Sequence, residues 1–450
     1  AFRMLALAAP LVDYFAQYRA DGVTSNVVLQ CAMIAMLSVH LAMFFALICI
    51  GVPIAFSMGT ASIWYLLTNG TSLSVAAQKF FTQTQSFSFL AVPFFVLAGT
   101  LMVEAGIAKK LINFASVLVR HLPAGLGCVS VVTSMILAGI SGSSVADASS
   151  VGAILIPEMN DRGYPPPFSA AINATSSVVG IIIPPSSTMI VISAITNLSV
   201  AKLFMAGAIP GIIIGLAFLA ITAYMGIKNN YPREARASKS EIWAATKDAL
   251  IAMVFPVFMV GSVVTGIATV TESASICAIY SLFVGIFVYK TLNLKKIYKA
   301  LADAAIGTTV VMMVVSCASI MQFILISQQV PTKLSNALLG LGLPNWLLLI
   351  MMVLLLGVAG MVMDNVPNLY IFLPIYIPIA QSMGMDPIQM AIICLCALAL
   401  GLFTPPVGTT LFISCNIAKC SIESVVKDLI PFFIAGVLIV VAVAFIPPLT

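Results

Sequence analysis

The feature that most constrains this chain is a run of small and hydroxylated residues from Gly139 to Ser150, which carries one acid, Asp147. Almost purely apolar sequence flanks this run on both sides. Gly and Ser weaken a helix, and Ser offers the backbone alternative hydrogen bonds. Inside a membrane, broken backbone is tolerated only where it lines a cavity or is buried in protein. The run therefore predicts a broken helix around 139–147 whose carbonyls and hydroxyls face something polar.

The run has a counterpart when the chain is compared with itself at an offset of 221 residues. Glycines and prolines then coincide far more often than the roughly 0.5 pairs expected by chance. Among the coinciding pairs are Gly139/Gly360, Pro157/Pro378, Gly163/Gly384, Pro184/Pro405, Pro185/Pro406, Pro210/Pro431 and Gly215/Gly436. This agreement indicates an internal duplication. Under it Ser143 is matched by Asp364 and Ser144 by Asn365, which predicts a second broken helix around 360–368.

Composition places the whole chain in a membrane. It is 61% apolar and only 8% charged, with a mean hydropathy of +1.13, whereas soluble domains carry about 25% charged residues. Spans of about 20 residues predict an all-α polytopic protein with about ten to twelve transmembrane helices. Lys and Arg cluster near 226–248 and 289–303, and the positive-inside rule predicts that these loops are cytoplasmic.

The sequence offers few residues suited to enzymatic catalysis. The cysteine spacing matches neither a disulfide scaffold nor a zinc site, and His40 and His121 are the only histidines. A Ser-His-Asp hydrolase would need His121, which lies beside Arg120 in front of a Pro-Ala-Gly loop. We therefore expect that the protein is not an enzyme.

The duplication predicts the following organisation. Residues 1–26 form an N-terminal connecting or interfacial segment, and 27–85 form scaffold helices. The first repeat, 86–226, contains a re-entrant hairpin at 86–106, the broken helix around 139–147 and a Pro-Pro break at 184–185. A cytoplasmic connection at 227–248 leads to the second repeat, 249–450. That repeat contains a hairpin at 255–280, extra scaffold helices at 304–345, the broken helix around 360–368 and a Pro-Pro break at 405–406.

Two further features bear on the site. A Pro pair removes backbone donors and disfavours helix just before it, so each Pro-Pro break is expected to leave unpaired carbonyls, for which a cation is one partner. The alternative is a kink repaired by neighbouring helices. A polar island formed by Thr269, Thr271 and Glu272 lies within apolar sequence, and it fits a role in the transport pathway as well as a structural hydrogen-bond anchor.

Paired broken helices with paired Pro-Pro breaks are typical of secondary transporters. A hard cation such as Na⁺ prefers oxygen ligands. The first repeat offers oxygens of Ser141, Ser143, Ser144 and Asp147 and carbonyls near Gly139 and Pro184; the second offers Asp364, Asn365, Asn368 and carbonyls near Pro405 and Gly408. Thr271 completes the predicted sodium ligands. No Walker-type nucleotide-binding run is present in the sequence, which leaves a sodium or proton gradient as the driving force.

Six segments together resemble the large membrane (M) subunit of TRAP (tripartite ATP-independent periplasmic) transporters. They are Leu90–Phe95, Gly139–Asp147, Ile183–Ser186, Thr269–Glu272, Met363–Pro367 and Thr404–Gly408. Val270 departs from the usual Ala at the centre of Thr-Ala-Thr, and we expect no functional consequence.

The resemblance implies an elevator-type transporter in the bacterial inner membrane, with two re-entrant hairpins and two broken helices in an inverted repeat. It implies Na⁺ coupling with roughly two or more ions per cycle, a small four-helix membrane partner (Q) and a periplasmic substrate-binding protein (P) that delivers an organic anion. It also places Ser143, Thr188 and Asp364 at the substrate.

The non-Met start resembles members in which Q and M are fused, as in sialic acid transporters. On that basis N-acetylneuraminate is the preferred substrate, with C4-dicarboxylates and other sugar acids as alternatives. Three other readings stay open: a sodium/dicarboxylate-type symporter that needs no binding protein, an ion channel, and an intramembrane hydrolase that uses Ser143 or Ser144.

Overall fold

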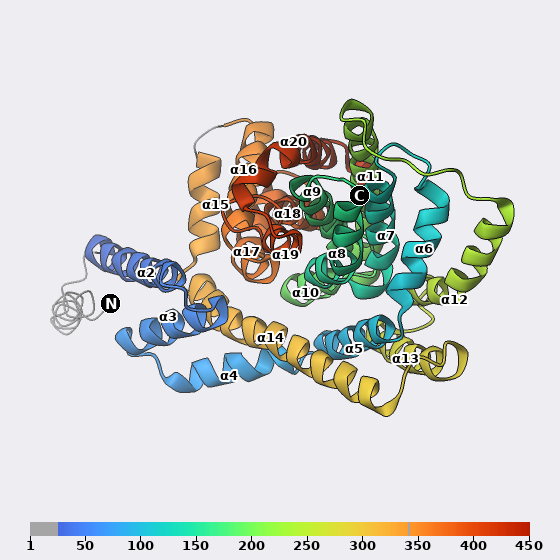
Figure 1. Ribbon diagram of the computed structural model, residues 1–450. Helices are drawn as coiled ribbons and strands as arrows, with labels where there is room; N and C mark the ends of the chain where they lie inside the picture. Colours follow the sequence, from blue (N-terminus) through green and yellow to red (C-terminus); the bar gives the residue numbers. More distant parts are fainter. Residues whose placement is uncertain (1–25, 341–342) are drawn as a thin grey trace. The chain divides into compact units, whose positions relative to one another are not determined.

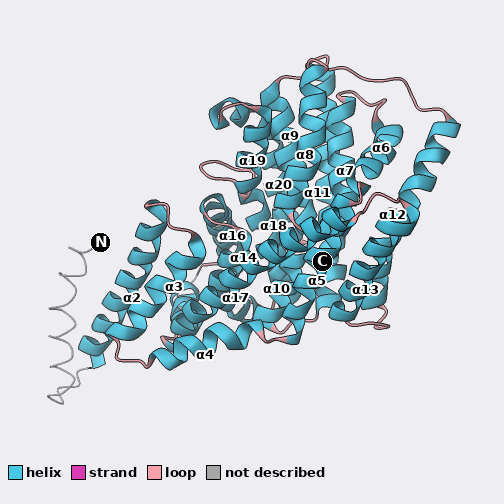
Figure 2. Cartoon of the chain, turned by 60° about the horizontal axis from the view of Figure 1, so that its bottom comes forward, coloured by secondary structure: helices cyan, strands magenta, loops and turns pink. Residues whose placement is uncertain are grey.

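The structure is a computed structural model that describes residues 26–340 and 343–450 (Figure 1). Every regular element in the described residues is a helix (Figure 2). The predicted N-terminal segment, 1–26, lies outside the described residues except for Asn26. The described chain divides into two compact units, 26–84 with 312–330, and 85–311 with 331–450, apart from residues 341–342.

The smaller unit contains α2 (Asn26–Cys49), α3 (Ile54–Thr68), α4 (Leu73–Thr84) and the end of α14 (Leu294–Ser327). Between α2 and α3 the chain turns at Gly51, which adopts a left-handed φ of 91°, and at Pro53. Its core packs Tyr65, Leu66 and Ala76 against Ile320 and Ile324. His40 is buried against the ring of Tyr65, with 5.3 Å between the ring centroids. The histidine therefore lies in an apolar helix pair.

The larger unit contains two sets of helices, one from each predicted repeat, and their bounds agree closely at the 221-residue offset. The first set is α7 (Gly125–Ser141), α8 (Ser144–Asp161), α9 (Pro166–Ser177), α10 (Ser187–Thr196) and α11 (Val200–Lys228). The second set is α16 (Asn345–Val362), α17 (Asn365–Ser382), α18 (Pro387–Gly401), α19 (Thr409–Ala418) and α20 (Ile422–Phe445). The bounds of α8 and α17 coincide residue for residue at this offset. The predicted interruptions around 139–147 and 360–368 are the junctions α7–α8 and α16–α17.

Each set contributes a helix that packs against helices of the other set. The helix that follows the second Pro-Pro break, α19, packs on α8 and α9 of the first set, and α10 packs on α17 of the second. Figure 1 shows α8, α9, α17, α18 and α19 gathered in one group. The backbones of α16 and α18 meet at Gly360 and Gly401, where a Cβ on Gly401 would lie 2.2 Å from the carbonyl carbon of Gly360. Small residues permit such close helix contacts in membranes.

The region predicted as a re-entrant hairpin, 86–106, is mostly one helix. After a short 3-10 turn (η1, Phe87–Leu90), α5 (Ala91–Glu104) runs without interruption through Pro93 and Gly99. The chain bends instead at Gly106, whose φ is 76°, and α6 (Ile107–Val119) leaves at 70° to α5. Pro93 lies in the first turn of α5, where backbone N–H groups have no partner within the helix, so the proline costs no hydrogen bond.

The second predicted hairpin, 255–280, starts earlier than expected. Helix α12 (Lys239–Val264) continues through Pro256, and its partner is α13 (Val270–Phe283). A π-helical turn, η3 (Val284–Val288), extends α13. The extra apolar sequence at 304–345 forms most of α14 together with α15 (Val330–Gly340).

Six described helices are long and apolar enough to cross a membrane, or seven if the bent pair α5–α6 is one span. This number is smaller than the predicted ten to twelve. The difference arises because many apolar segments are interrupted, so that α7, α10, α18 and α19 are each shorter than a full span.

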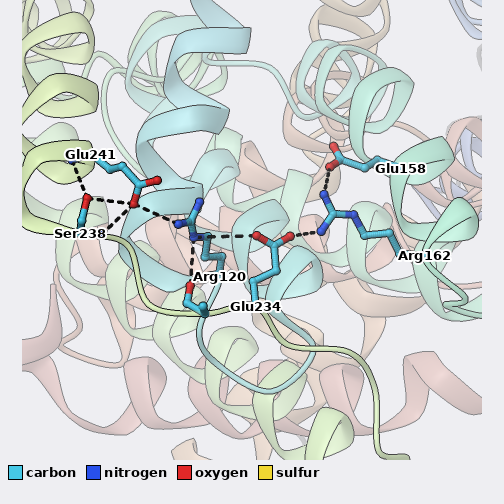
Figure 3. Close-up of polar contacts among 7 residues, drawn as sticks. Arg120, Glu158, Arg162, Glu234, Ser238 and Glu241 are labelled. Atoms are coloured by element: carbon cyan, nitrogen blue, oxygen red, sulfur yellow. Dashed lines mark hydrogen bonds and ion pairs between the residues drawn. The ribbon is translucent and has the colours of Figure 1, made fainter.

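The connection between the repeats, 229–238, is held by an ion-pair network (Figure 3). Glu234 pairs with Arg162, at the end of α8, and lies 3.8 Å from Nε of Arg120, at the end of α6. Arg120 also donates to Glu241 at 3.2 Å, and Arg162 to Glu158 at 2.8 Å. The backbone N–H of Glu234 donates to the carbonyl of Arg120. The connection therefore links the ends of α6 and α8 to the start of α12.

Candidate functional site

The first tip is a tight turn between α7 and α8. Helix α7 ends at Ser141, and Gly142 takes a left-handed φ of 57° that favours glycine. Ser143 then caps α8, and its hydroxyl accepts a hydrogen bond from Ala146 N at 3.4 Å. Across the turn, Ser141 Oγ donates to Asp147 Oδ1 at 2.5 Å. The predicted residues Ser141, Ser143 and Asp147 thus form one local constellation.

Asp147 is fully buried with one oxygen unsatisfied. Its Oδ2 has no hydrogen-bond partner among the described residues. That oxygen points at Gly180 of η2 (Val178–Ile181), where an added Cβ would lie 2.2 Å away. Buried polar oxygens are nearly always paired, and a buried carboxylate without a partner is expensive. Asp147 therefore presents an oxygen that a cation could satisfy.

The first Pro-Pro break meets this tip. Ser187 Oγ, at the start of α10, donates to the carbonyl of Gly142 at 2.8 Å. A Cβ on Gly142 would lie 3.0 Å from the Pro185 carbonyl oxygen, and one on Gly139 would lie 3.9 Å from that of Pro184. The structure brings together the predicted carbonyl positions at Gly139 and Pro184. The peptide bond between Pro184 and Pro185 is cis.

The second tip is built differently. Asp364 occupies the N-cap of α17, but its side chain makes no capping bond. Asn368 Nδ2 donates instead to the carbonyls of Met363 and Asp364, at 3.1 Å each. The side-chain oxygens Oδ1 of Asn365 and Asn368 are buried without a partner among the described residues. At the 221-residue offset Asn368 is the equivalent of Asp147.

The second Pro-Pro break also meets its own tip. Val407 N donates to the carbonyl of Met361 at 3.2 Å, and this bond joins the break to the end of α16. Gly408, with a φ of 51°, precedes α19. The hydroxyl of Thr409 is buried without a partner among the described residues. The peptide bond between Pro405 and Pro406 is cis, as in the first repeat.

Hydrogen bonds between α9 and α19 join the two repeats. They involve three polar residues that the sequence-based prediction missed. Asn173 Nδ2, on α9, donates to the Ala148 carbonyl on α8 at 2.9 Å and to Ser414 Oγ on α19 at 2.8 Å. Thr410 Oγ1 donates to the Ala174 carbonyl at 3.1 Å. No local pattern distinguishes these residues from other polar groups in apolar helices. Their partners lie up to 241 residues away.

Two predicted residues occupy contrasting places. Thr188 is buried in the first turn of α10, a helix that packs on α17 of the second set. Thr271 lies in the first turn of α13, whose main neighbours are α5 and α12. Thr269 and Glu272 form a capping box, with Thr269 N donating to Glu272 Oε2 at 2.7 Å. The polar island is therefore the start of a helix.

Comparison with known proteins assigns the chain to a family. A family model described as "Tripartite ATP-independent periplasmic transporter, DctM component" matches residues 41–449. The chain belongs to this family. It is thus a multi-pass permease subunit of the bacterial inner membrane and not an enzyme, in agreement with the sequence-based expectation.

Three relatives illustrate the range of the DctM family. The chain is 34% identical over 406 residues to the 2,3-diketo-L-gulonate TRAP transporter large permease protein YiaN of Escherichia coli, covering 89% of this chain and 95% of YiaN. It is 33% identical over 451 residues to the isethionate TRAP transporter permease protein DctMQ of Oleidesulfovibrio alaskensis, covering 97% and 71%. It is 31% identical over 401 residues to the sialic acid TRAP transporter large permease protein SiaM of Vibrio cholerae, covering 89% and 94%.

A solved structure extends the agreement to the fold. The YdaH transporter of Alcanivorax borkumensis aligns with a TM-score of 0.57 at 13% identity, covering 83% of this chain and 89% of that one. The DctM-family chain therefore has an all-helical transporter fold with paired interruptions.

Proposed function

We propose that this DctM-family permease takes up an organic acid by sodium-coupled secondary transport of the elevator type. In this proposal the two tips and the two Pro-Pro breaks hold Na⁺ and the anion together. Substrate and ions then cross the membrane as a transport domain, built from the two hairpins and the two broken helices, slides against the scaffold helices.

The observation that carries the proposal is the pair of equivalent unsatisfied oxygens, Asp147 Oδ2 and Asn368 Oδ1. Each lies one turn into the helix that follows a tip, and each tip contacts its own Pro-Pro break. Na⁺ is a hard cation that takes carboxylate, amide and carbonyl oxygens. The oxygen atoms around each tip therefore fit Na⁺ as ligands. The first repeat offers Asp147, the hydroxyl of Ser141 and carbonyls near Gly139 and Pro184. The second repeat offers Asn365, Asn368 and carbonyls near Pro405 and Gly408, and Ser144 extends the first set.

An anionic substrate is supported by the direction of the helices. Helices α8, α10, α17 and α19 all begin at a tip or a break, so each directs its positive N-terminal end at a tip or a break. Ser143, Thr188 and Asp364 stand at three of these starts. We propose that Ser143 and Thr188 donate to the anion, and that Asp364 accepts from its hydroxyl or amide groups.

The relatives guide the choice of acids and partners to test. Those compared above are named for a sugar acid, a sulfonate and sialic acid at similar identities. N-acetylneuraminate is the substrate that we propose to test first, alongside 2,3-diketo-L-gulonate, isethionate and a C4-dicarboxylate. We propose a periplasmic binding protein (P) and a small membrane subunit (Q) as partners. The relative DctMQ, named for both M and Q, aligns over 97% of this chain and 71% of its own length, and it supports Q as a partner.

Reconstitution in liposomes tests the proposal. Uptake of each labelled acid is measured with an inward Na⁺ gradient, with K⁺ in place of Na⁺, and with or without the cognate binding protein. The proposal requires uptake that depends on both Na⁺ and the binding protein and that is lost in Asp147→Ala. Uptake that persists unchanged in K⁺ would remove sodium, and uptake without any binding protein would favour a self-sufficient symporter.

A further inference from the structure

A groove outside the proposed site runs along the second repeat. Its wider part encloses about 470 Å³ between the start of α16, the turn 383–386 and the end of α20. A narrower part of about 110 Å³ continues between α16 and α20. The two parts share Leu349, Ala444 and Phe445, so they form one continuous groove. Its volume is in the range of small-molecule sites.

The groove changes character along its length. The narrow part is lined by aliphatic residues of two candidate membrane spans, among them Val353 on α16 and Val441 on α20. The wide part lies where α16 begins, at Asn345, and where α20 ends, at Phe445. Trp346 stands at this mouth with 54% of its surface exposed, as aromatic residues do at the level of lipid headgroups. The groove thus leads from a polar mouth into the hydrocarbon region.

The charge at the mouth is negative. Among the described residues that line the groove, Asp386 is the one charged side chain. Asp386 Oδ1 accepts a hydrogen bond from Ile388 N at 2.8 Å, and the side chain is otherwise exposed. Beside it, Gln389 Nε2 is occupied by the carbonyls of Val443 and Ala444. A headgroup placed here would meet a fixed acid and no lysine or arginine among these lining residues.

We propose that this groove binds a phospholipid with a primary ammonium headgroup, as in phosphatidylethanolamine. One acyl chain lies between α16 and α20, and the ammonium group faces Asp386. The narrow part opens on the outer faces of two membrane spans, where Leu354 is 59% exposed, and a soluble protein cannot reach that depth. The acid disfavours an anionic phospholipid by like-charge repulsion. A lipid here would hold the start of α16, and with it the second tip, against α20.

Photocrosslinking tests the proposal on the complete transporter in mild detergent. The probe is phosphatidylethanolamine with a diazirine in one acyl chain, and the labelled residues are mapped by mass spectrometry. Labelling is expected to concentrate on 345–354 and 437–447. Unlabelled phosphatidylethanolamine should compete, and phosphatidylglycerol should not.

Two matched pairs of variants sharpen the test. Val441→Trp fills the groove and should reduce labelling about tenfold, because excluding a few methylene groups costs that much affinity. Leu438→Trp, on the same helix but 64% exposed and outside the groove lining, should leave labelling unchanged. Asp386→Asn keeps a side-chain oxygen for Ile388 N and should abolish the preference over phosphatidylglycerol. Asp303→Asn removes an exposed acid of α14 that does not line the groove, and it should leave the preference unchanged.

Several outcomes would overturn the proposal. They are uniform labelling of all lipid-facing helices, equal competition by phosphatidylglycerol for the wild-type protein, and labelling that survives Val441→Trp. Labelling removed by the periplasmic binding protein but not by unlabelled lipid would assign the groove to protein docking instead.

Discussion

Asp147 and Asn368 occupy equivalent positions in two helices related by 221 residues, and each buries a side-chain oxygen that has no partner among the described residues. One is a carboxylate and the other a neutral amide. If both bind Na⁺, the carboxylate supplies most of the electrostatic attraction, and the two sites should differ in sodium affinity.

Asp147→Asn is therefore expected to raise the Na⁺ concentration needed for half-maximal uptake by at least about tenfold, since charged hydrogen-bonding or ion-pairing partners contribute roughly 1.5–3 kcal/mol. Uptake titrated against Na⁺ in liposomes measures this. Asp161→Asn removes an exposed acid from the same helix and should leave the titration unchanged. An unaltered titration in Asp147→Asn would show that the carboxylate is structural.

Gly180→Ala should also raise the Na⁺ concentration needed for half-maximal uptake, although it leaves the Asp147 side chain chemically unchanged. The new Cβ would lie 2.2 Å from Asp147 Oδ2, so either the carboxylate or η2 has to move. We expect reduced Na⁺ affinity with normal expression. Gly357→Ala, at a helical glycine with open space around its Cβ position, is the control and should be neutral or stabilising by about 0.5–1 kcal/mol. Equal behaviour of the two variants would contradict the proposed position of Asp147.

Asp364→Ala should abolish Na⁺-dependent uptake and leave expression intact. The side chain of Asp364 makes no capping bond in α17, so its loss removes no helix cap. Uptake and membrane abundance are measured together. Near-normal transport would show that Asp364 does not face the substrate or the ion.

Asn173→Ala should lower the stability of the fold, because it leaves the Ala148 carbonyl and the Ser414 hydroxyl without this donor. The expected loss is about 1–3 kcal/mol, seen as a lower melting temperature in detergent. A double-mutant cycle with Ser414→Ala isolates the contact between the repeats. Strictly additive losses would show that the hydrogen bond between α9 and α19 contributes nothing.

Glu234→Gln should have a much smaller effect. Glu234 faces both Arg120 and Arg162, but the pair with Arg162 is substantially exposed, at 32% and 43% of the side-chain surface. Exposed pairs contribute about 1 kcal/mol or less. The melting temperature should therefore fall by less than in Asn173→Ala, and the difference from wild type should shrink at high salt. A larger, salt-independent loss would indicate a structural role for the connection.

The interruptions were predictable because their causes are local. At the first tip Gly142 supplies a left-handed turn and Ser143 a cap, and at both Pro-Pro breaks the proline pairs remove donors. The second tip has neither feature and was located through the internal duplication. A single proline is not such a cause at Pro93, because the cost of a proline depends on where the helix begins, and α5 begins two residues earlier. Thr269 and Glu272 could have been recognised as a capping box from their three-residue spacing.

Partners across the repeats were not predictable in the same way. Asn173 and Ser414 lie 241 residues apart, and neither position carries a local signal for the other. Gly180 offered a partial clue, since its equivalent at the 221-residue offset is also a glycine, Gly401. Gly180 lies against the side chain of Asp147, and Gly401 lies against the backbone of Gly360. The packing of α13, which carries Thr271, on α5 is likewise specified by no periodicity in its sequence.

The exchange of α10 and α19 between the repeats has a consequence for biosynthesis. A nascent chain that ends near residue 228 has made α8, α9 and α10, but α10 lacks α17, and α8 and α9 lack α19. The first half should then remain accessible to proteases and membrane chaperones until the second half has been synthesised. Neither half should fold when expressed alone, whereas the two halves expressed together should give a folded protein.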